Sequence, residues 1–142
     1  MRDKRGAFIH NALTQNGLPY IWGGQSPVVG FDCSGFVVWL LQSVGYVITD
    51  HTAKQLSYIF ESTRVHGTPK AGCIAFYGFG GEVSHCMVVT RVWNNGAIAV
   101  TGARGGGSDT TTIDVAEEKR AYVGTYVNYW PQNLIMICDP WG

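Results

Sequence analysis

The segment that most constrains the fold is residues 34–44, which is apolar on almost every side. If it is helical, nearly all of its circumference is covered by Phe36, Val37, Val38, Trp39, Leu40, Leu41 and Val44. A helix with apolar side chains all round is stable only when other elements surround it. Gly45 ends the pattern. We therefore predict a helix buried in the middle of a domain.

The second half of the chain changes from helical to strand-like patterns. Short runs of β-branched, aromatic and aliphatic side chains, most of them bounded by turn residues, occur at residues 73–77, 83–93, 97–102, 122–127 and 134–138. Asn-Asn-Gly at 94–96 is a strong hairpin signal, because asparagine and glycine both tolerate positive φ. We expect 83–93 and 97–102 to pair as antiparallel strands.

Helices are predicted mainly in the first half. Residues 2–16 carry an apolar stripe at helical spacing, which Gly17 ends, and residues 52–59 form a shorter helix capped by Asp50 or Thr52. Helices followed by an antiparallel sheet indicate an α+β fold, with the sheet packed on the central helix. A chain of 142 residues is long enough for one domain, which we predict over 1–142.

Composition excludes several functional classes. Ten basic residues balance ten acidic ones, so the chain has no basic surface for nucleic acid. No segment reaches the length of a membrane span. The N-terminal residues have positive charge but lack the apolar stretch of a secretory signal. We expect a protein made in the cytoplasm without a signal peptide.

Four cysteines, at 33, 73, 86 and 138, include no CxxC pair, and we expect free thiols. The four histidines are scattered singly, at positions 10, 51, 66 and 85, whereas zinc ligands occur at short paired spacings. We therefore predict no metal site and no cofactor.

Cys33 is the strongest candidate for chemistry, because it follows Asp32 at the start of the apolar helix. The positive end of a helix favours a thiolate, and such sites lower a cysteine pKa from ~8.5 to ~3.5–7.5. Unpaired backbone N–H groups there can also bind an oxyanion. The alternative is that Cys33 is only a small buried residue, as free cysteines often are.

His85 is the histidine that lies inside a predicted strand, where it can serve as a base for a cysteine nucleophile. Strand alternation places Val83, His85, Met87 and Val89 on one face and Ser84, Cys86 and Val88 on the other. By this pattern Cys86 points away from the imidazole. A strand histidine can also be an interior residue without catalytic function.

Two motifs resemble those of the NlpC-type cell-wall peptidases, a branch of the papain-like cysteine peptidases. Residues 18–24 read Leu-Pro-Tyr-Ile-Trp-Gly-Gly, and residues 32–36 read Asp-Cys-Ser-Gly-Phe. Pro-Lys-Ala-Gly at 69–72, a strand and then Ser84-His85 resemble the second motif of that family in the same order. Thr-Ala-Lys-Gln at 52–55 is similar to the short helix between the two motifs. The glycine-rich remainder resembles small phage-associated members.

The resemblance implies a papain-like fold, in which a buried helix carries the nucleophile against a small antiparallel sheet that carries the base. It implies hydrolysis of an amide bond in peptidoglycan stem peptides, with Cys33 as nucleophile and His85 as general base. Tyr20 would help to bind the oxyanion, while Asp32 and Ser34 would line the pocket for a free amine of the substrate. Simpler functions remain open: aromatic packing for Tyr20, and a helix cap for Asp32.

The resemblance is weakest at the third catalytic residue, a polar side chain on the strand after His85 that orients the imidazole. Depending on register, this position falls on Thr101 or Gly102, and we take Thr101 as the candidate. Residues 105–112 are glycine- and threonine-rich but lack the lysine of a phosphate-binding loop, so a flexible loop beside the substrate is expected. Arg104 either binds a stem-peptide carboxylate or is solvated.

Two other functions stay open at this point. A phage-tail or wall-binding module could keep the fold without efficient chemistry. A lipid acyltransferase or thioesterase could use the same Cys–His pair, although no membrane anchor is evident. For the leading interpretation we expect a monomer that reaches the cell wall after release or through a phage tail or other delivery system.

Overall fold

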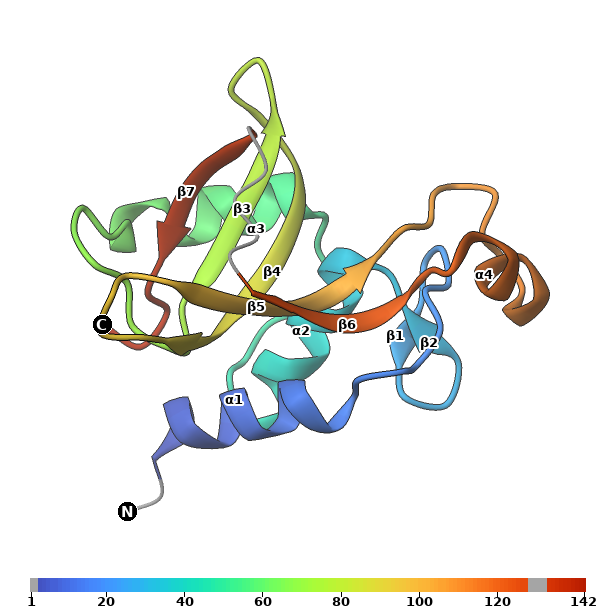
Figure 1. Ribbon diagram of the computed structural model, residues 1–142, viewed down its shortest axis with the longest axis horizontal. Helices are drawn as coiled ribbons and strands as arrows, with labels where there is room; N and C mark the ends of the chain where they lie inside the picture. The colour runs from blue at the N-terminus through green and yellow to red at the C-terminus, as the bar shows by residue number, and fades with distance from the viewer. Residues whose placement is uncertain (1–2, 128–132) are drawn as a thin grey trace.

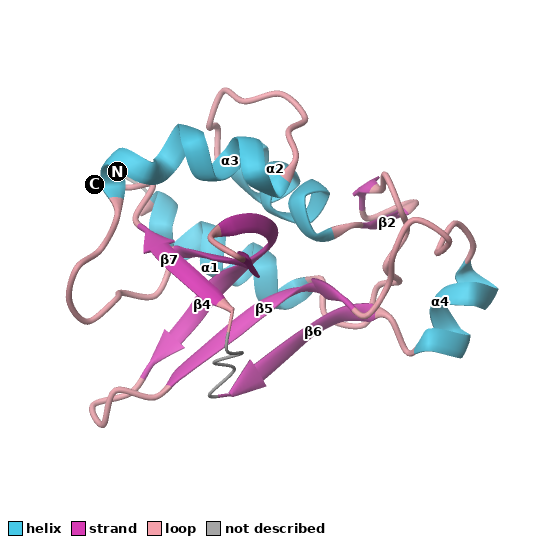
Figure 2. Ribbon diagram, turned by 90° about the horizontal axis from the view of Figure 1, so that it is seen from above, coloured by secondary structure: helices cyan, strands magenta, loops and turns pink. Residues whose placement is uncertain are grey.

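Three helices lie on one face of a five-stranded sheet in the computed structural model, which describes residues 3–127 and 133–142 (Figures 1 and 2). The first half of the chain forms α1 (Lys4–Thr14), β1 (Gln25–Ser26), β2 (Gly30–Phe31), α2 (Cys33–Ser43), α3 (Ala53–Phe60) and a 3-10 turn (Glu61–Thr63). The second half forms β3 (Ile74–Phe79), β4 (Glu82–Val92), β5 (Ile98–Arg104), α4 (Ile113–Lys119), β6 (Tyr122–Val127) and β7 (Leu134–Cys138). The predicted α+β fold is confirmed.

The sheet has the strand order β6-β5-β4-β3-β7, and every neighbouring pair is antiparallel. The predicted hairpin is confirmed, because β4 pairs with β5 across the turn at residues 94–96. The register of this pair runs from Val92–Ile98 to Val88–Thr101. His85 therefore lies on β4 beyond the paired part of the hairpin.

The main core lies between the helices and the sheet. α2 is buried along most of its length, and Phe8 of α1 and Leu56 of α3 are fully buried beside it. Phe36 of α2 packs edge-on against Phe31, with ring centroids 5.3 Å apart. Figure 1 shows α2 at the centre of the molecule, as the all-round apolar pattern predicted. Its fixed position holds the first residue of α2 against the sheet.

The opposite face of the sheet forms a second, smaller core. Its buried members in the described chain are sheet residues and neighbours of the sheet: Cys73, Ala75, Tyr77, Met87, Val89, Ile98, Val100 and Ile137. The sheet is strongly coiled in Figure 2, as the right-handed twist of strands allows. Among the described residues, none of the members of this core lies in a helix.

The predicted faces of β4 are confirmed for four residues and are wrong for Val83. Cys86 and Val88 pack in the helix-side core, and Met87 and Val89 pack in the second core, as alternation predicts. Val83, expected beside His85, packs instead against the helix-side core. The reason is a bulge: β3 pairs Tyr77 with His85 but Gly78 with Val83, which leaves Ser84 as an extra residue.

Besides the 3-10 turn, three short elements were not predicted. Strands β1 and β2 have two residues each, which is too short for an alternation pattern. Helix α4 has seven residues, and only Ala116 of these is buried, so the sequence shows no apolar stripe there. The predicted domain over 1–142 stays a prediction.

Candidate active site

The first turn of α2 carries the candidate nucleophile. Asp32 caps this helix: its carboxylate accepts hydrogen bonds from the Gly35 N–H at 2.7 Å and the Gly23 N–H at 3.0 Å, and the Ser34 hydroxyl lies 3.4 Å away. Cys33 is therefore the first helical residue, at the positive end of the helix. Burial, with the nearby acidic groups of Cys33 and Asp50, raises the pKa of Asp32 despite these hydrogen bonds.

A close backbone approach fixes the loop before α2 on that first turn. The Asp32 N–H donates to the Gly24 carbonyl at 3.1 Å, and a Cβ on Gly35 would lie 2.0 Å from the same oxygen. Any side chain at position 35 would push the loop away. The glycine after Cys33-Ser34 is thus explained by contact with residues 21–24, which carry Trp22 toward the pocket.

A pocket of about 300 Å³ opens in front of Cys33. Its lining residues are Tyr20, Trp22, Gly23, Asp32, Cys33, Ser34, Asp50, His51, Thr52, Ala53 and Ser84. The structure thus brings together four of the predicted site residues, from the loop before α2 and its first turn. Asp50 and His51 were not predicted to lie here. They precede the Thr52 cap of α3, so an expected helix start near the nucleophile was the available signal.

The His85 imidazole approaches the Cys33 thiol from β4, next to the lining residue Ser84. The nearby imidazole helps to lower the pKa of the Cys33 thiol. On its other side the ring lies against Tyr77, the cross-strand neighbour on β3, with ring centroids 5.6 Å apart. The His85 Nε2 atom is buried and has no hydrogen-bond partner among the described residues. Packing therefore positions the imidazole more than hydrogen bonding does.

A second thiol, Cys86, also meets Cys33. Its Sγ lies 3.6 Å from the Cys33 carbonyl oxygen, and the two thiols interact. The pKa of Cys33 is held well below its usual range. The main cause is the Cys86 thiol, the His85 imidazole adds to it, and burial opposes both. The pKa of Cys86 is raised by Cys33 and by burial. Sequence reasoning missed this contact because Cys86 was placed only relative to the imidazole.

Tyr20 forms one wall of the pocket and is held from behind by the loop after β5. A Cβ on Gly106 would lie 2.2 Å from the Tyr20 ring, so this loop packs directly on the ring. The Tyr20 N–H donates to the Ala121 carbonyl at 2.9 Å, and the Trp22 N–H donates to the Thr110 carbonyl at 2.8 Å. Burial, and the nearby Cys33 and Asp32, raise the pKa of Tyr20, which keeps its hydroxyl protonated as a donor.

Thr101 does not lie beside His85. It pairs with Val88, three residues along β4, and its hydroxyl lies 3.0 Å from that of Thr90 and 2.8 Å from that of Thr125. Among the described residues its hydroxyl bonds to these two threonines and not to His85, and the predicted orienting role of Thr101 stays a prediction. Gly102, the other candidate, has no side chain, and a Cβ there would lie 3.0 Å from the Met87 Cγ.

Residues 17–137 match the sequence pattern of the NlpC/P60 family. The chain belongs to the NlpC/P60 family. This confirms the predicted resemblance at the level of the family.

Curated NlpC/P60 relatives include larger proteins. The chain is 37% identical over 84 residues to a probable endopeptidase of Mycobacterium tuberculosis, a match covering 59% of this chain and 20% of that protein. It is 27% identical over 127 residues to the murein DD-endopeptidase MepH of Escherichia coli, covering 89% of this chain and 46% of that protein. The chain thus spans less than half of the length of these relatives.

Solved NlpC/P60 structures share the fold. The NlpC/p60 domain of the peptidoglycan hydrolase SagA has a TM-score of 0.63 and 25% identity, over 95% of this chain and 97% of that one. NlpC1 of Trichomonas vaginalis has a TM-score of 0.68 at 15% identity, over 100% of this chain and 46% of that one. The second likeness concerns the fold alone.

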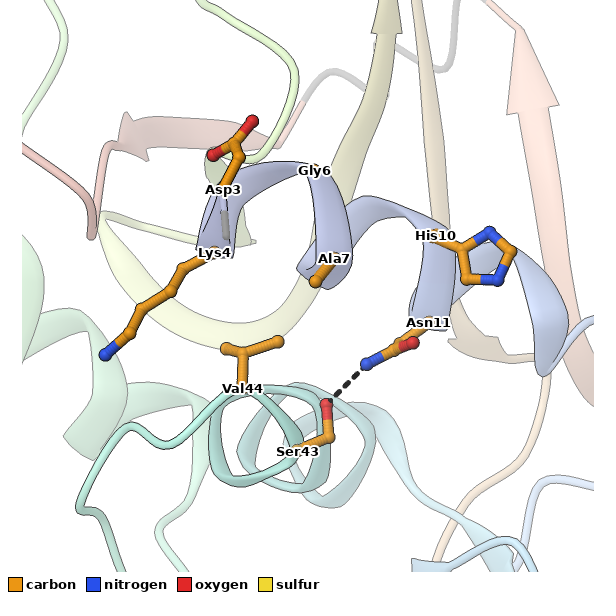
Figure 3. A pocket seen from close by; sticks show the side chains of 8 residues that line it. All are labelled: Asp3, Lys4, Gly6, Ala7, His10, Asn11, Ser43 and Val44. Atoms are coloured by element: carbon orange, nitrogen blue, oxygen red, sulfur yellow. Dashed lines mark hydrogen bonds between the residues drawn. The ribbon is translucent and has the colours of Figure 1, made fainter. Parts of the chain in front are cut away.

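Other features of this NlpC/P60 domain lie apart from Cys33. Arg104 stacks over the Tyr126 ring at 4.9 Å, and it does not line the pocket. Figure 3 shows a larger hollow of about 730 Å³ between α1 and the far end of α2, where Asn11 donates to Ser43 at 2.9 Å. His10 lies there, but no cysteine does. This hollow therefore lacks a nucleophile of the thiol type.

Neither a cluster of metal ligands nor a membrane-spanning helix is present among the described residues. Within residues 3–127 and 133–142, no three histidine, cysteine, aspartate or glutamate side chains gather as metal ligands would. Over the same residues, no helix combines the length and apolar character needed to cross a bilayer.

Proposed function

We propose that this chain hydrolyses an amide bond in the stem peptides of peptidoglycan, with Cys33 as nucleophile and His85 as general base. One observation carries the proposal: the Cys33 thiol starts a buried helix, faces a pocket and interacts with the His85 imidazole. A low-pKa thiol next to an imidazole is the arrangement that cysteine acyl transfer requires. Membership in the NlpC/P60 family adds support, because relatives carry the name endopeptidase.

The proposed reaction has two steps. The Cys33 thiolate attacks the carbonyl carbon, and His85 gives a proton to the leaving amine, which produces a thioester on Cys33. His85 then takes a proton from water, and the hydroxide attacks the thioester to release the carboxylic acid and the thiolate. Both steps place negative charge on the substrate carbonyl oxygen.

Donors for that oxygen are available around Cys33. The Gly35 and Phe36 N–H groups are already bonded to Asp32, so the N–H groups of Cys33 and Ser34 are the ones left at the helix start. The Tyr20 hydroxyl in the same pocket stays protonated because its pKa is raised. In the proposal, Tyr20 and these N–H groups bind the oxyanion.

Acidic groups on the same side of the pocket suit a cationic substrate group. Asp32 and Asp50 both line the pocket, and the Ser34 hydroxyl donates to the Asp32 carboxylate at 3.4 Å. A free amine of a stem peptide would be attracted by the two carboxylates. Trp22, which is 54% exposed, offers an apolar surface at the rim. The proposed substrate is therefore a peptide with a free amine near the scissile bond.

The test compares the protein with Cys33→Ala and Cys73→Ala on isolated peptidoglycan. Fragments released by the wild type and by Cys73→Ala, but not by Cys33→Ala, would support the proposal, and their masses would identify the bond. Binding of the wall without release of fragments by any of the three would favour a wall-binding module instead. Release of acyl groups from lipid substrates alone would favour an acyltransferase or thioesterase. Monomeric state and delivery by a phage tail stay predictions.

A further inference from the structure

Cys86 is a buried thiol that the proposed hydrolysis does not use. It has no exposed surface, and its Sγ lies 3.6 Å from the Cys33 carbonyl oxygen. The Cys86 thiol on β4 thus contacts the first residue of α2, and each of the two thiols shifts the pKa of the other. The only other cysteines, Cys73 and Cys138, are buried elsewhere in the sheet.

Access to solvent differs between the two thiols. Cys33 is partly exposed and lines the pocket, so a small reagent can reach it. Cys86 is in the helix-side core, paired across β3 with Phe76 and followed on its own face by Val88. A reagent in solution therefore meets Cys33 first, and the partner available to Cys86 is Cys33.

We propose that Cys33 and Cys86 form a reversible disulfide when the protein meets a peroxide, which switches the pocket off. The inference rests on the proposed function in that Cys33 is taken as the reactive thiol. It assigns Cys86 as the thiol that resolves the oxidised form of Cys33. Sequence spacing gives no hint of it, because 52 residues separate the two cysteines.

The chemistry needs only hydrogen peroxide as the oxidant. The Cys33 thiolate attacks one peroxide oxygen, the O–O bond breaks, and Cys33 becomes a sulfenic acid while hydroxide leaves. The Cys86 sulfur then attacks the Cys33 sulfur, the S–O bond breaks, and water forms from the hydroxyl group and the proton of Cys86. Two thiols have lost two electrons, and one peroxide has been reduced to two molecules of water.

A second thiol protects the nucleophile in this scheme. Without a partner, a sulfenic acid is oxidised further to sulfinic and sulfonic acids, which thiol reductants do not reverse. With Cys86 in place, the disulfide forms first, and a dithiol can restore both residues by exchange. The pair therefore converts irreversible damage into a reversible loss of the free nucleophile.

The test is mass spectrometry of the reduced full-length chain after treatment with hydrogen peroxide. We expect the wild type to lose the mass of two hydrogen atoms and to regain it with dithiothreitol. Digestion with trypsin and a glutamate-specific protease, without reduction, separates Cys73 from Cys86 by cleavage after Glu82. The cross-linked peptide should then contain Cys33 and Cys86.

Two variants serve as contrasts. Cys86→Ala should gain one oxygen, which dimedone traps on Cys33, and then further oxygens that dithiothreitol does not remove. Cys73→Ala should behave as the wild type. If Cys86→Ala does not fold, as judged by circular dichroism, Cys86→Ser replaces it, and the cross-link map of the wild type needs no variant.

Other outcomes overturn the proposal. Direct accumulation of oxygen on wild-type Cys33 without loss of hydrogen, or a disulfide through Cys73, Cys138 or a second chain, excludes the proposed pair. The masses do not depend on hydrolysis. A Cys33–Cys86 disulfide in a protein that releases no wall fragments would keep this inference and reject the proposed function, and the reverse result would do the opposite.

Discussion

The pocket at the start of α2 and the body of the sheet differ in the hydrogen-bond partners of their polar groups and in the direction in which the pKa of their cysteines is shifted. In the sheet, the Thr101 hydroxyl has hydrogen-bond partners on both sides, and burial raises the pKa of Cys73 and that of Cys138, the latter to about 11. In the pocket region, partners lower the pKa of the partly exposed Cys33, and the His85 Nε2 has no partner among the described residues.

The difference shows that burial alone does not make a cysteine reactive. Desolvation disfavours the thiolate at all three of these cysteines, and only Cys33 has a helix start, an imidazole and a second thiol to offset it. At Cys33 these partners, and not burial, set the direction of the pKa shift. Five predictions break or sharpen this comparison, beginning with the largest expected effect.

Removal of either member of the proposed pair should abolish most of the activity. We expect Cys33→Ala and His85→Ala to lower the rate of fragment release from peptidoglycan by about 10³-fold or more, because each removes a group that bonds to or exchanges protons with the substrate. Cys138→Ala, which changes a cysteine in the sheet body, is the control and should keep the rate within a few-fold. An equal loss of fragment release in all three variants would contradict the proposed difference between the pocket and the sheet body.

The pH dependence of alkylation should separate the cysteines. A thiol reacts as the thiolate, so a lowered pKa extends reaction toward lower pH. An ordinary thiol of pKa about 8.5 loses about 50-fold of its thiolate between pH 8.5 and 6.5. We expect Cys33 to lose much less of its rate with iodoacetamide over this range, while Cys73 and Cys138 stay unmodified in the folded protein. Peptide mapping of native samples at each pH measures all three.

Cys86→Ala should shift the pH profile of Cys33 alkylation toward higher pH, while Cys33 remains reactive. A hydrogen bond to a charged group contributes about 1.5–3 kcal/mol, so its loss should slow alkylation of Cys33 at pH 6.5 by about tenfold. The direction is a higher pKa for Cys33, and rates at pH 9.5 should converge. Cys73→Ala serves as the matched control. An unchanged profile in Cys86→Ala would mean that His85 and the helix start suffice.

Asp139→Asn should weaken the contact between α1 and the segment after β7 while leaving the pocket intact. Asp139, next to Cys138, accepts two hydrogen bonds from Arg5 at 2.8 and 2.9 Å, and these oppose the effect of burial and lower its pKa. We expect the free energy of unfolding at pH 7 to fall by about 1–2 kcal/mol.

The same variant has a defined pH dependence. Because the folded-state pKa of Asp139 is lowered, its contribution is complete above the ordinary aspartate pKa of about 3.9 and is lost as pH falls through the folded value. Urea unfolding of both proteins at several pH values checks this. A difference that grows toward low pH would contradict the assignment.

The smallest effect on activity is expected for Thr101→Val, which also tests the predicted third catalytic residue. The substitution leaves the hydroxyls of Thr90 and Thr125 without one partner each, at a cost of about 1 kcal/mol in the free energy of unfolding. We expect fragment release to change by less than about twofold. A large loss of activity at unchanged stability would support Thr101 as the orienting residue.

Much of the fold followed from local patterns with a clear physical origin. The all-round apolar segment gave the buried helix, the Asn-Asn-Gly turn gave the hairpin, and the short apolar runs gave the five strands of the main sheet. These patterns depend on period and on φ, which the sequence carries directly. Helix α4 was not predicted because a single buried alanine forms no apolar stripe at helical spacing.

The site was predictable where it depends on a helix start and not where it depends on pairing details. Asp32, Cys33 and Ser34 are consecutive, so placing one places the others. The faces of β4 could be read only as far as the bulge at Ser84, where an extra residue reverses the alternation. Contact between Cys86 and Cys33 depends on how α2 lies over β4, which is a tertiary property without a sequence period.

The turn between β4 and β5 offers a practical attachment point. Its residues Asn94, Asn95 and Gly96 are exposed, and Val92 follows His85 by seven positions along the strand, which corresponds to about 23 Å. A fluorophore or an affinity tag joined to this turn would project from the opposite end of the hairpin. Labelled protein could then be followed on intact cell walls while both the pocket and its thiols stay in their native state.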